Sequence, residues 1–415
     1  MATAAEPRLT GRIAFSYPGF TVYQVARFLI VTGMEMQSVA VGWQVYEITH
    51  RALDLGLVGL AQFLPGLLLF LASGHAADRF DRRKLLLVCY AGFALSSAFL
   101  LGISWRAPQS VYSIYGVLVF IGVVRSMSAP VSRAILPQLV AEEHFQNAVA
   151  WNSSIFMTAT ILGPALGGVV YAASRGPSAV YVAGFAFAVV SFLFGLRINP
   201  TPRTKPPEEL SLKTVLAGLH YIWDQKLILG SISLDMFAVL LGGAVALLPI
   251  YASEILRTGP WGLGLLRSAP GVGAAVMAVL VAHRPLQRRV GATMLWCVAG
   301  FGVFTILFGI SRSFVLSLIA LLLTGACDMV SVIVRGTLVQ LATPDEMRGR
   351  VNAVDMIFIG VSNELGQFES GLTAAWFGAV PAVILGGIGT LAVIATWSWL
   401  FPELRKADRL LSPAE

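Results

Sequence analysis

Eleven residues, from 74 to 84, interrupt an apolar sequence with a dense cluster of charge, Gly-His-Ala-Ala-Asp-Arg-Phe-Asp-Arg-Arg-Lys. Long apolar runs lie on both sides of this cluster, from Leu53 to Ala77 and from Leu85 to Trp105. Because an ionised side chain at the centre of a bilayer costs roughly 2.5–3.5 kcal/mol, these charges cannot enter hydrocarbon together. We therefore expect a tight turn at a membrane surface between two spanning helices.

The composition of the whole chain agrees with this interpretation. Of its 415 residues, 56% are hydrophobic and 12% are charged, whereas soluble domains contain about 25% charged residues. A helix needs about 20 apolar residues to span the hydrocarbon, and runs of that length recur along the chain. The sequence predicts an all-α integral membrane protein, with twelve transmembrane helices in two pseudo-symmetric six-helix bundles. The expected helices are 20–48, 54–77, 84–104, 110–137, 146–173, 177–197, 227–252, 261–283, 290–310, 314–342, 350–376 and 380–402.

The longest spacer lies in the middle of the chain, at 198–226. It begins with a proline-rich stretch that cannot be helical. Leu212, Val215, Leu216, Leu219 and Trp223 then follow at helical spacing, which predicts an amphipathic helix on the membrane surface. The expected organisation is a cytoplasmic N-terminal tail (1–19), a first bundle (20–197), a cytoplasmic linker (198–226), a second bundle (227–402) and a cytoplasmic C-terminal tail (403–415).

Lys and Arg are unevenly distributed over the two sides of this topology. Most lie in the tails, the linker and the loops on one side; those in the opposite loops are Arg51, Arg106, Arg175, Arg257 and Arg312. Because basic residues concentrate on the cytoplasmic side, both termini are expected there, in a multi-pass protein of the bacterial cytoplasmic (inner) membrane. The net charge of +7 then reflects orientation and contact with anionic lipid, not nucleic-acid binding. The three cysteines fall in apolar runs, which argues against a disulfide framework.

The two halves of the sequence resemble each other. Arg133-Ala-Ile-Leu-Pro-Gln-Leu recurs as Arg335-Gly-Thr-Leu-Val-Gln-Leu, an offset of 202 residues. Asn-Ala-Val follows both copies, at Asn147 and at Asn352. Two six-helix repeats in the same orientation are the plan of many secondary transporters.

The charged cluster also resembles a loop signature of the major facilitator superfamily, through Gly74, Asp78, Arg79, Arg82 and Arg83. Asp81 stands where that signature has glycine, and we expect it to cap the next helix by accepting hydrogen bonds from its free amides. The resemblance implies that Asp78 and Arg82 brace a cytoplasmic gate against the other half. The simpler alternative is that these charges only set the topology.

A second stretch resembles a motif of the antiporter branch of the same superfamily, and its residues are Gly163, Pro164, Gly167 and Gly168. We expect these glycines to allow close helix packing and Pro164 to bend the helix. Residues 41–47 and 234–238 are most similar to the drug and siderophore (enterobactin, macrolide) exporter branch. In this superfamily helices 1, 4, 7 and 10 largely line a central cavity.

Ionisable residues inside spanning helices need a reason, because they are costly there. The predicted limits place Glu35, Arg125, Asp328 and Glu364 near the midplane, and Asp235 about 7 Å towards the cytoplasm. By the repeat, Arg125 corresponds to the neighbour of Asp328, so these two are expected to face each other. They form either a pair that a proton or substrate breaks, or a buried pair that only fixes helix packing.

Glu35 is the first choice for the proton-coupling acid, and Glu364 is its rival. Asp235 is either part of this central site or a gate or cap residue near the cytoplasmic mouth. Arg133 and Arg335, which end their helices, are expected to snorkel or to pair at a gate. Polar residues that either contact substrate in the cavity or pack between helices are Trp43, Gln44, Asn152 and Asn363.

Several chemistries are absent from the sequence. It contains no Gly-Lys-Ser/Thr phosphate loop, no Gly-x-Ser-x-Gly elbow and no His-Glu-x-x-His site. We therefore expect no enzyme, no cofactor and no metal. The sequence predicts a secondary active, proton-coupled exporter of an amphiphilic organic molecule, acting as a monomer by alternating access. The alternatives are a lipid or lysolipid transporter without proton coupling and, in another class, a non-transporting membrane scaffold or receptor.

Overall fold

A computed structural model describes residues 11–106, 110–200, 212–284 and 289–406, and those residues contain helices and no strand. Most of the predicted N-terminal tail, part of the linker and most of the C-terminal tail lie outside the described residues. The side chain of Asp78, a member of the predicted gate motif, also lies outside them.

The first half of the chain contains six membrane-crossing units. A short 3₁₀ helix, η1 (Ile13–Ser16), precedes them. They are α1 (Pro18–Thr49), α2 (Ala52–Leu68) continued by α3 (Phe70–Arg79), α4 (Arg82–Trp105), α5 (Tyr112–Ile135), α6 (Phe145–Ser174) and α7 (Ser178–Gly195). The predicted helix 54–77 is interrupted at Leu69, one turn after Pro65, which lies inside α2.

The second half begins with the amphipathic helix that the linker pattern predicts, α8 (Leu212–Asp224). Its first crossing unit is segmented into α9 (Lys226–Gly242), η4 (Val245–Leu247), α10 (Leu248–Ile250) and a π-helical turn, η5 (Tyr251–Ile255). The remaining helices are α11 (Gly259–His283), α12 (Val290–Ile310), α13 (Phe314–Ala342), α14 (Asp345–Phe377), α15 (Ala379–Leu400) and α16 (Pro402–Lys406).

Nine helical stretches of the described residues are both long and apolar enough to cross a membrane. Three further crossing units fall outside that group. The apolar helix α2 has 17 residues, while α1 and α14 are longer but carry charged residues along their length. Together they make the twelve predicted crossings. The two long helices outside the apolar group, α1 and α14, carry Glu35 and Glu364.

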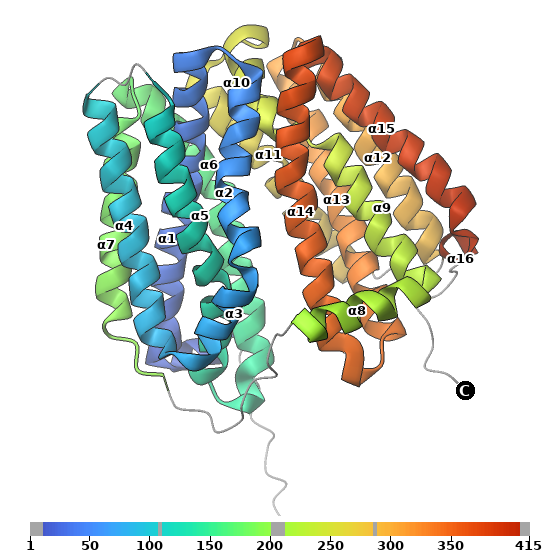
Figure 1. Cartoon of the computed structure of the whole chain (residues 1–415), viewed down its shortest axis with the longest axis horizontal. Helices are drawn as coiled ribbons and strands as arrows, with labels where there is room; N and C mark the ends of the chain where they lie inside the picture. The colour runs from blue at the N-terminus through green and yellow to red at the C-terminus, as the bar shows by residue number, and fades with distance from the viewer. Residues whose placement is uncertain (1–10, 107–109, 201–211, 285–288, 407–415) are drawn as a thin grey trace, which may run out of the picture.

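Figure 1 shows the two halves as separate bundles, α1–α7 and α9–α15, that diverge towards the end of the molecule where α8 lies. We call that end the linker end; the α3–α4 turn also lies there. The opposite end, which holds the α1–α2 connection at His50 and Arg51, is the distal end. The halves contact each other mainly where α2 packs on α14 and where α6 packs on α11.

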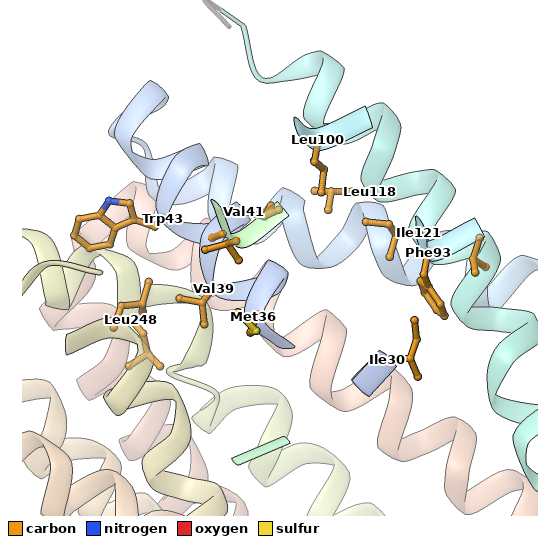
Figure 2. Packing of buried hydrophobic residues seen from close by; sticks show 14 of the residues in the cluster. Ile30, Met36, Val39, Val41, Trp43, Phe93, Leu100, Leu118, Ile121 and Leu248 are labelled. Atoms are coloured by element: carbon orange, nitrogen blue, oxygen red, sulfur yellow. The ribbon is translucent and has the colours of Figure 1, made fainter. Parts of the chain in front are cut away.

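Glycines make these two contacts close. A Cβ atom on Gly56 of α2 would lie 3.2 Å from the Cα of Gly371 in α14, and one on Gly168 of α6 would lie 2.9 Å from the Cα of Gly264 in α11. Both contacts lie in the distal parts of their helices. A continuous hydrophobic cluster also crosses the halves: Figure 2 shows Met36 of α1, with Leu248 of α10 on one side and Ile121 of α5 on the other. The halves are therefore joined distally.

The charged cluster forms a shorter turn than the sequence predicts. The helix α3 continues to Arg79, so only Phe80 and Asp81 separate it from α4. The Asp81 carboxylate accepts hydrogen bonds from the backbone amides of Arg83, at 2.9 Å, and Lys84, at 3.1 Å. The predicted N-cap is confirmed, and it explains how an acid can stand at the position where the signature has glycine.

Candidate functional site

A cavity of about 110 Å³ lies between the two halves. Helices α1, α2, α4 and α5 line it from the first half, and η4, α10, α11 and α14 line it from the second. Apolar side chains such as Phe93 and Ile121 form part of the wall. The polar and charged residues that line it are Glu35, Gln37, Ser38, Gln62, Arg125, Arg267, Glu364 and Gln367.

Two bases and two acids dominate the electrostatics of this cavity, one of each from either half. Glu364 lies close enough to Arg125, Arg267 and Glu35 for their charges to interact with it. Arg125 donates a hydrogen bond of 3.0 Å to Gln62, and Arg267 crosses between the halves to donate one of 2.7 Å to Ser38. The charged side chains of the cavity can therefore change their ion-pair partners when the halves move, or when an acid takes up a proton.

The structure brings together three of the predicted midplane residues, Glu35, Arg125 and Glu364. The expected Arg125–Asp328 pair is not formed, because Asp328 lies in another cluster. Sequence reasoning missed Arg267, Gln62 and Gln367. Their polarity was the available signal, because Arg267, like Arg125, is a charged residue within a predicted spanning helix.

The second charged cluster lies inside the second half. Arg335, 3% exposed, forms ion pairs with Asp235, at 3.3 Å, and with Asp355, at 2.6 Å. Asp328 lies near Asp235 and Arg335, and Ser331 donates a 3.4 Å hydrogen bond to Asp235. Arg335 is thus a buried, paired residue of α13, and the expectation that it snorkels to the surface is wrong.

Two of the predicted substrate contacts are engaged in helix packing. Trp43 donates a 2.5 Å hydrogen bond to Glu47, and Gln44 bonds both Ser104, at 3.0 Å, and Tyr181, at 2.7 Å. Neither residue lines the cavity, although their neighbours Val41 and Gly42 do. Both side chains point to a different side of α1 from the residues that line the cavity.

The two asparagines differ in their surroundings. Asn363 donates to the backbone carbonyl of Ile359, one turn earlier in α14, and is exposed. Asn152 of α6 accepts a 3.3 Å hydrogen bond from Gln24 of α1. Neither lines the central cavity, but Asn152 lies on the linker side of it, where a second polar region is found.

The arginines of the charged turn contact their own half. Arg82 donates a 3.2 Å hydrogen bond to the carbonyl of Ala134, at the end of α5. Arg83 donates to the carbonyl of Leu196 and, at 3.4 Å, to Asn199, both just after α7. In this conformation these side chains tie together the linker ends of α4, α5 and α7. Among the described residues, Arg82 forms no hydrogen bond or ion pair with the other half, where a brace was expected.

The glycines of the α6 motif all face another helix closely. A Cβ on Gly163 would meet the Cβ of Glu35, and one on Gly167 would lie 2.7 Å from the Cα of Met36. Gly168 faces the second half, as described above. This stretch therefore sets the position of Glu35 on α1 and the contact between the halves at the same time.

A further contact between the halves lies at the distal end. The Tyr46 hydroxyl of α1 donates a hydrogen bond to the carboxylate of Glu254, which lies in the π-helical turn of the second half. Both residues line a second cavity of about 650 Å³, together with His50 and Arg51. Sequence reasoning missed this pair, since Tyr46 and Glu254 are 208 residues apart.

The described residues hold no group of three His, Cys, Asp or Glu side chains that could bind a metal ion. Cys89, Cys297 and Cys327 are free thiols. The site consists of charges and amides between the two halves. Two helical bundles around a central polar cavity define a membrane transporter of the major facilitator class.

Comparison with known proteins gives the family. A family model described as transmembrane secretion effector matches residues 12–413, and the chain belongs to this family of the major facilitator superfamily. The chain is 27% identical to the enterobactin exporter EntS of Citrobacter koseri and 26% identical to that of Shigella boydii, in each case over 94% of both chains. Its fold is similar to that of a bacterial homologue of the human lysosomal transporter Spinster in an inward-facing, occupied conformation, with a TM-score of 0.73, 12% identity and coverage of 99% and 100% of the two chains. The homologues are transporters and not enzymes.

Proposed function

We propose that this protein is a proton-coupled exporter that moves an amphiphilic organic molecule out of the bacterial cytoplasm by alternating access. The observation that carries the proposal is the central cavity, where Glu35 and Arg125 of the first half meet Arg267 and Glu364 of the second. Charges contributed by both halves respond to any relative movement of the halves. The likeness to enterobactin exporters supports an outward direction.

The linker end is assigned to the cytoplasm, because the basic residues of the α3–α4 turn lie there. The distal end then faces the periplasm. Close glycine contacts, the Arg267–Ser38 hydrogen bond and the Tyr46–Glu254 hydrogen bond all join the halves on the distal side of the cavity or within it. We infer that this conformation is closed to the periplasm and receives substrate from the cytoplasm.

Proton coupling is assigned to the cavity acids. When Glu35 or Glu364 is neutralised by a proton, the two arginines lose an attractive partner, and the charge balance between the halves changes. Asp235 and Asp328 form a second candidate proton site through their shared proximity to Arg335.

The cavity of about 110 Å³ is smaller than the 300–1,000 Å³ of typical small-molecule pockets, so an organic substrate must extend beyond it or widen it.

The proposal is tested with purified protein in proteoliposomes that contain a trapped pH-sensitive dye. An imposed pH gradient should drive the transport of members of a panel of anionic, neutral and cationic amphiphilic dyes. Glu35→Gln and Glu364→Gln should uncouple transport from the gradient, whereas Glu403→Gln, near the end of the chain, should not. Full pH-driven transport by both cavity variants would contradict the assignment of the coupling residues.

The main alternative is lipid or lysolipid movement without proton coupling. It predicts that a fluorescent lysolipid crosses the proteoliposome membrane at the same rate with and without a protonophore. A scaffold or receptor predicts no flux of any compound, although binding is retained. The same preparation therefore separates the three candidate functions.

A further inference from the structure

Arg27 lies on the cavity-facing side of α1 but nearer the linker end. It precedes the cavity residue Met34 by seven residues, or two helical turns, which is about 10 Å along the axis. Its Nη1 atom donates a 3.1 Å hydrogen bond to the hydroxyl of Tyr23, and its guanidinium lies over the ring of Phe156, 5.3 Å from the centroid. Its buried Nε atom has no hydrogen-bond partner among the described residues.

Arg133 of α5 is the second cation of this region. It is exposed, and it lies close enough to Arg27 for the two positive charges to repel each other. Across the described ranges, no carboxylate lies within 4.0 Å of either arginine. Two like charges on helices that cross a membrane need a counter-charge, and the described residues do not supply one.

The internal repeat shows how unusual this arrangement is. The repeat equivalent of Arg133 is Arg335, which is buried between Asp235 and Asp355. Asp355 directly follows the second Asn-Ala-Val triplet, whereas the residue that follows the first triplet is Ala150. The second half therefore neutralises its arginine with its own acids, whereas no described carboxylate of the first half pairs with the equivalent arginine.

The surroundings of the two arginines suit an aromatic anion. A guanidinium binds carboxylate and phosphate oxygens through parallel N–H donors, and its faces stack on rings. Phe156 is 42% exposed beside Arg27 and offers such a ring. On the neighbouring turn the Oε1 atom of Gln24, a buried acceptor, has no partner among the described residues and can accept from a hydroxyl group.

We propose that Arg27 and Arg133, with Phe156, form the cytoplasmic entry site for the substrate and bind an acidic group, such as a carboxylate or an ionised phenol, that is attached to an aromatic ring. This inference gives the substrate of the proposed exporter a charge class, and its role in transport rests on that function. Binding itself can be measured without transport. A phosphate of a lipid headgroup has related chemistry, and the experiment separates the two sources.

The test uses two dyes that share a xanthene ring and differ in charge: fluorescein, an anion at pH 8, and rhodamine 123, a cation. Their binding to the full-length protein in phosphatidylcholine nanodiscs is followed by fluorescence anisotropy. The wild-type protein should bind fluorescein, and Arg27→Gln/Arg133→Gln should weaken that binding by about tenfold or more, as expected for lost charge-assisted hydrogen bonds. Rhodamine 123 binding should change less than about twofold.

Three single variants complete the set. Ala150→Asp introduces an acid at the repeat position of Asp355 and should also weaken fluorescein binding. Arg106→Gln removes an exposed arginine from the distal end and should leave it unchanged. Arg133→Gln alone, at an exposed position, keeps the test valid if the double variant does not fold.

The proposal is overturned if the wild-type protein does not bind fluorescein, if the arginine variants bind it normally, or if they weaken the binding of both dyes equally. It is also overturned if replacing a quarter of the phosphatidylcholine with phosphatidylglycerol displaces fluorescein, because the cluster then binds a lipid headgroup. Selective fluorescein binding without any flux would support the site and contradict the exporter function. Flux of cationic dyes alone, with no fluorescein binding, would support the exporter function and contradict the entry site.

Discussion

The contact between Gly168 and Gly264 should control whether the periplasmic side can close. A Cβ atom added to Gly168 would come closest to the carbonyl oxygen of Pro260 and would lie 2.9 Å from the Cα of Gly264, whereas ordinary contacts begin at 3.4 Å. The obstacle is backbone, which cannot rotate away as a flexible side chain can. In Gly168→Ala the helices α6 and α11 must therefore separate by about one ångström, or the distal contact must open.

Overpacking a close contact typically costs about 1–3 kcal/mol. The cost applies only to the conformation in which the distal ends meet, because the added methyl group has free space once they separate. A differential of this size shifts a two-state equilibrium about 5- to 150-fold. Gly168→Ala should thus move the population towards the conformation that is open at the distal end, while the individual bundles keep their structure.

The measurement is the distance between spin labels on two exposed distal residues, Arg51 of the first half and Trp376 of the second, in a variant whose three cysteines are replaced by alanine. A second pair at the linker end, Phe80 and Leu341, both exposed, reports on the opposite side. Gly168→Ala should lengthen the distal distance and shorten the linker-end distance.

Gly102→Ala in α4 is the matched control, because a Cβ there meets nothing within 4 Å. It corrects for the gain in helix propensity, about 1 kcal/mol, that every glycine-to-alanine change brings. Distances that are the same in Gly168→Ala and in the control would refute the reasoning. Longer distances at both ends would show general loosening and would refute it as well.

Three further changes test single contacts. Tyr46→Phe removes the hydrogen bond to Glu254 and, at about 1.5–3 kcal/mol for a bond to a charged group, should also lengthen the distal label distance; an unchanged distance would mean that this bond does not hold the end closed. Asp81→Ala should lower the free energy of unfolding by about 1 kcal/mol through loss of the N-cap, measured by thermal unfolding in detergent, and Asp81→Ser should retain most of it. Arg335→Met leaves Asp235 buried without its partner and should cost about 3–5 kcal/mol, and Arg335→Met combined with Asp235→Leu should recover much of the lost thermal stability if the pair is structural.

The fold could be predicted from sequence because hydrocarbon imposes one length on every crossing helix. That constraint gives the helix limits to within a few residues along most of the chain. The exceptions lie at Leu69 and after Gly242, where crossing units are segmented. The Asp81 cap was also predictable, because an N-cap involves only a side chain and the backbone amides two and three residues later.

The sequence predicts the depth at which the site residues lie in the membrane, but not the direction in which their side chains point. A rise of 1.5 Å per residue places a side chain along the membrane normal, and Glu35, Arg125 and Glu364 do meet at one depth. The same rule says nothing about which side of the helix faces the cavity. Asp328, at a similar depth, turns into its own bundle, and Gln44 turns towards α4 and α7.

The π-helical turn adds a second reason why the distal contact could not be foreseen. A π turn inserts an extra residue and rotates everything that follows relative to a regular α-helix. Glu254 lies inside this turn, so its direction depends on an irregularity that hydrophobic periodicity does not report. Only the folded backbone reveals that Glu254 points at Tyr46.

Acidic and basic residues are distributed unequally between the two halves, and this distribution bears on how the movements of a proton and a substrate can be coupled. Among the charged residues of the central cavity and of the two clusters on its linker side, the first half supplies more bases than acids, and the second supplies more acids than bases. The residues are Arg27, Arg125, Arg133 and Glu35 in the first half, and Arg267, Arg335, Asp235, Asp328, Asp355 and Glu364 in the second. On the proposed assignments, the anion binds the arginines of the first half, and the second half supplies most of the acids that can take up protons. The two ligands then need not compete for one residue. Because each changes the charge of a different half, their coupling must pass through the contact surface between the halves, where Gly168 meets Gly264 and Arg267 meets Ser38.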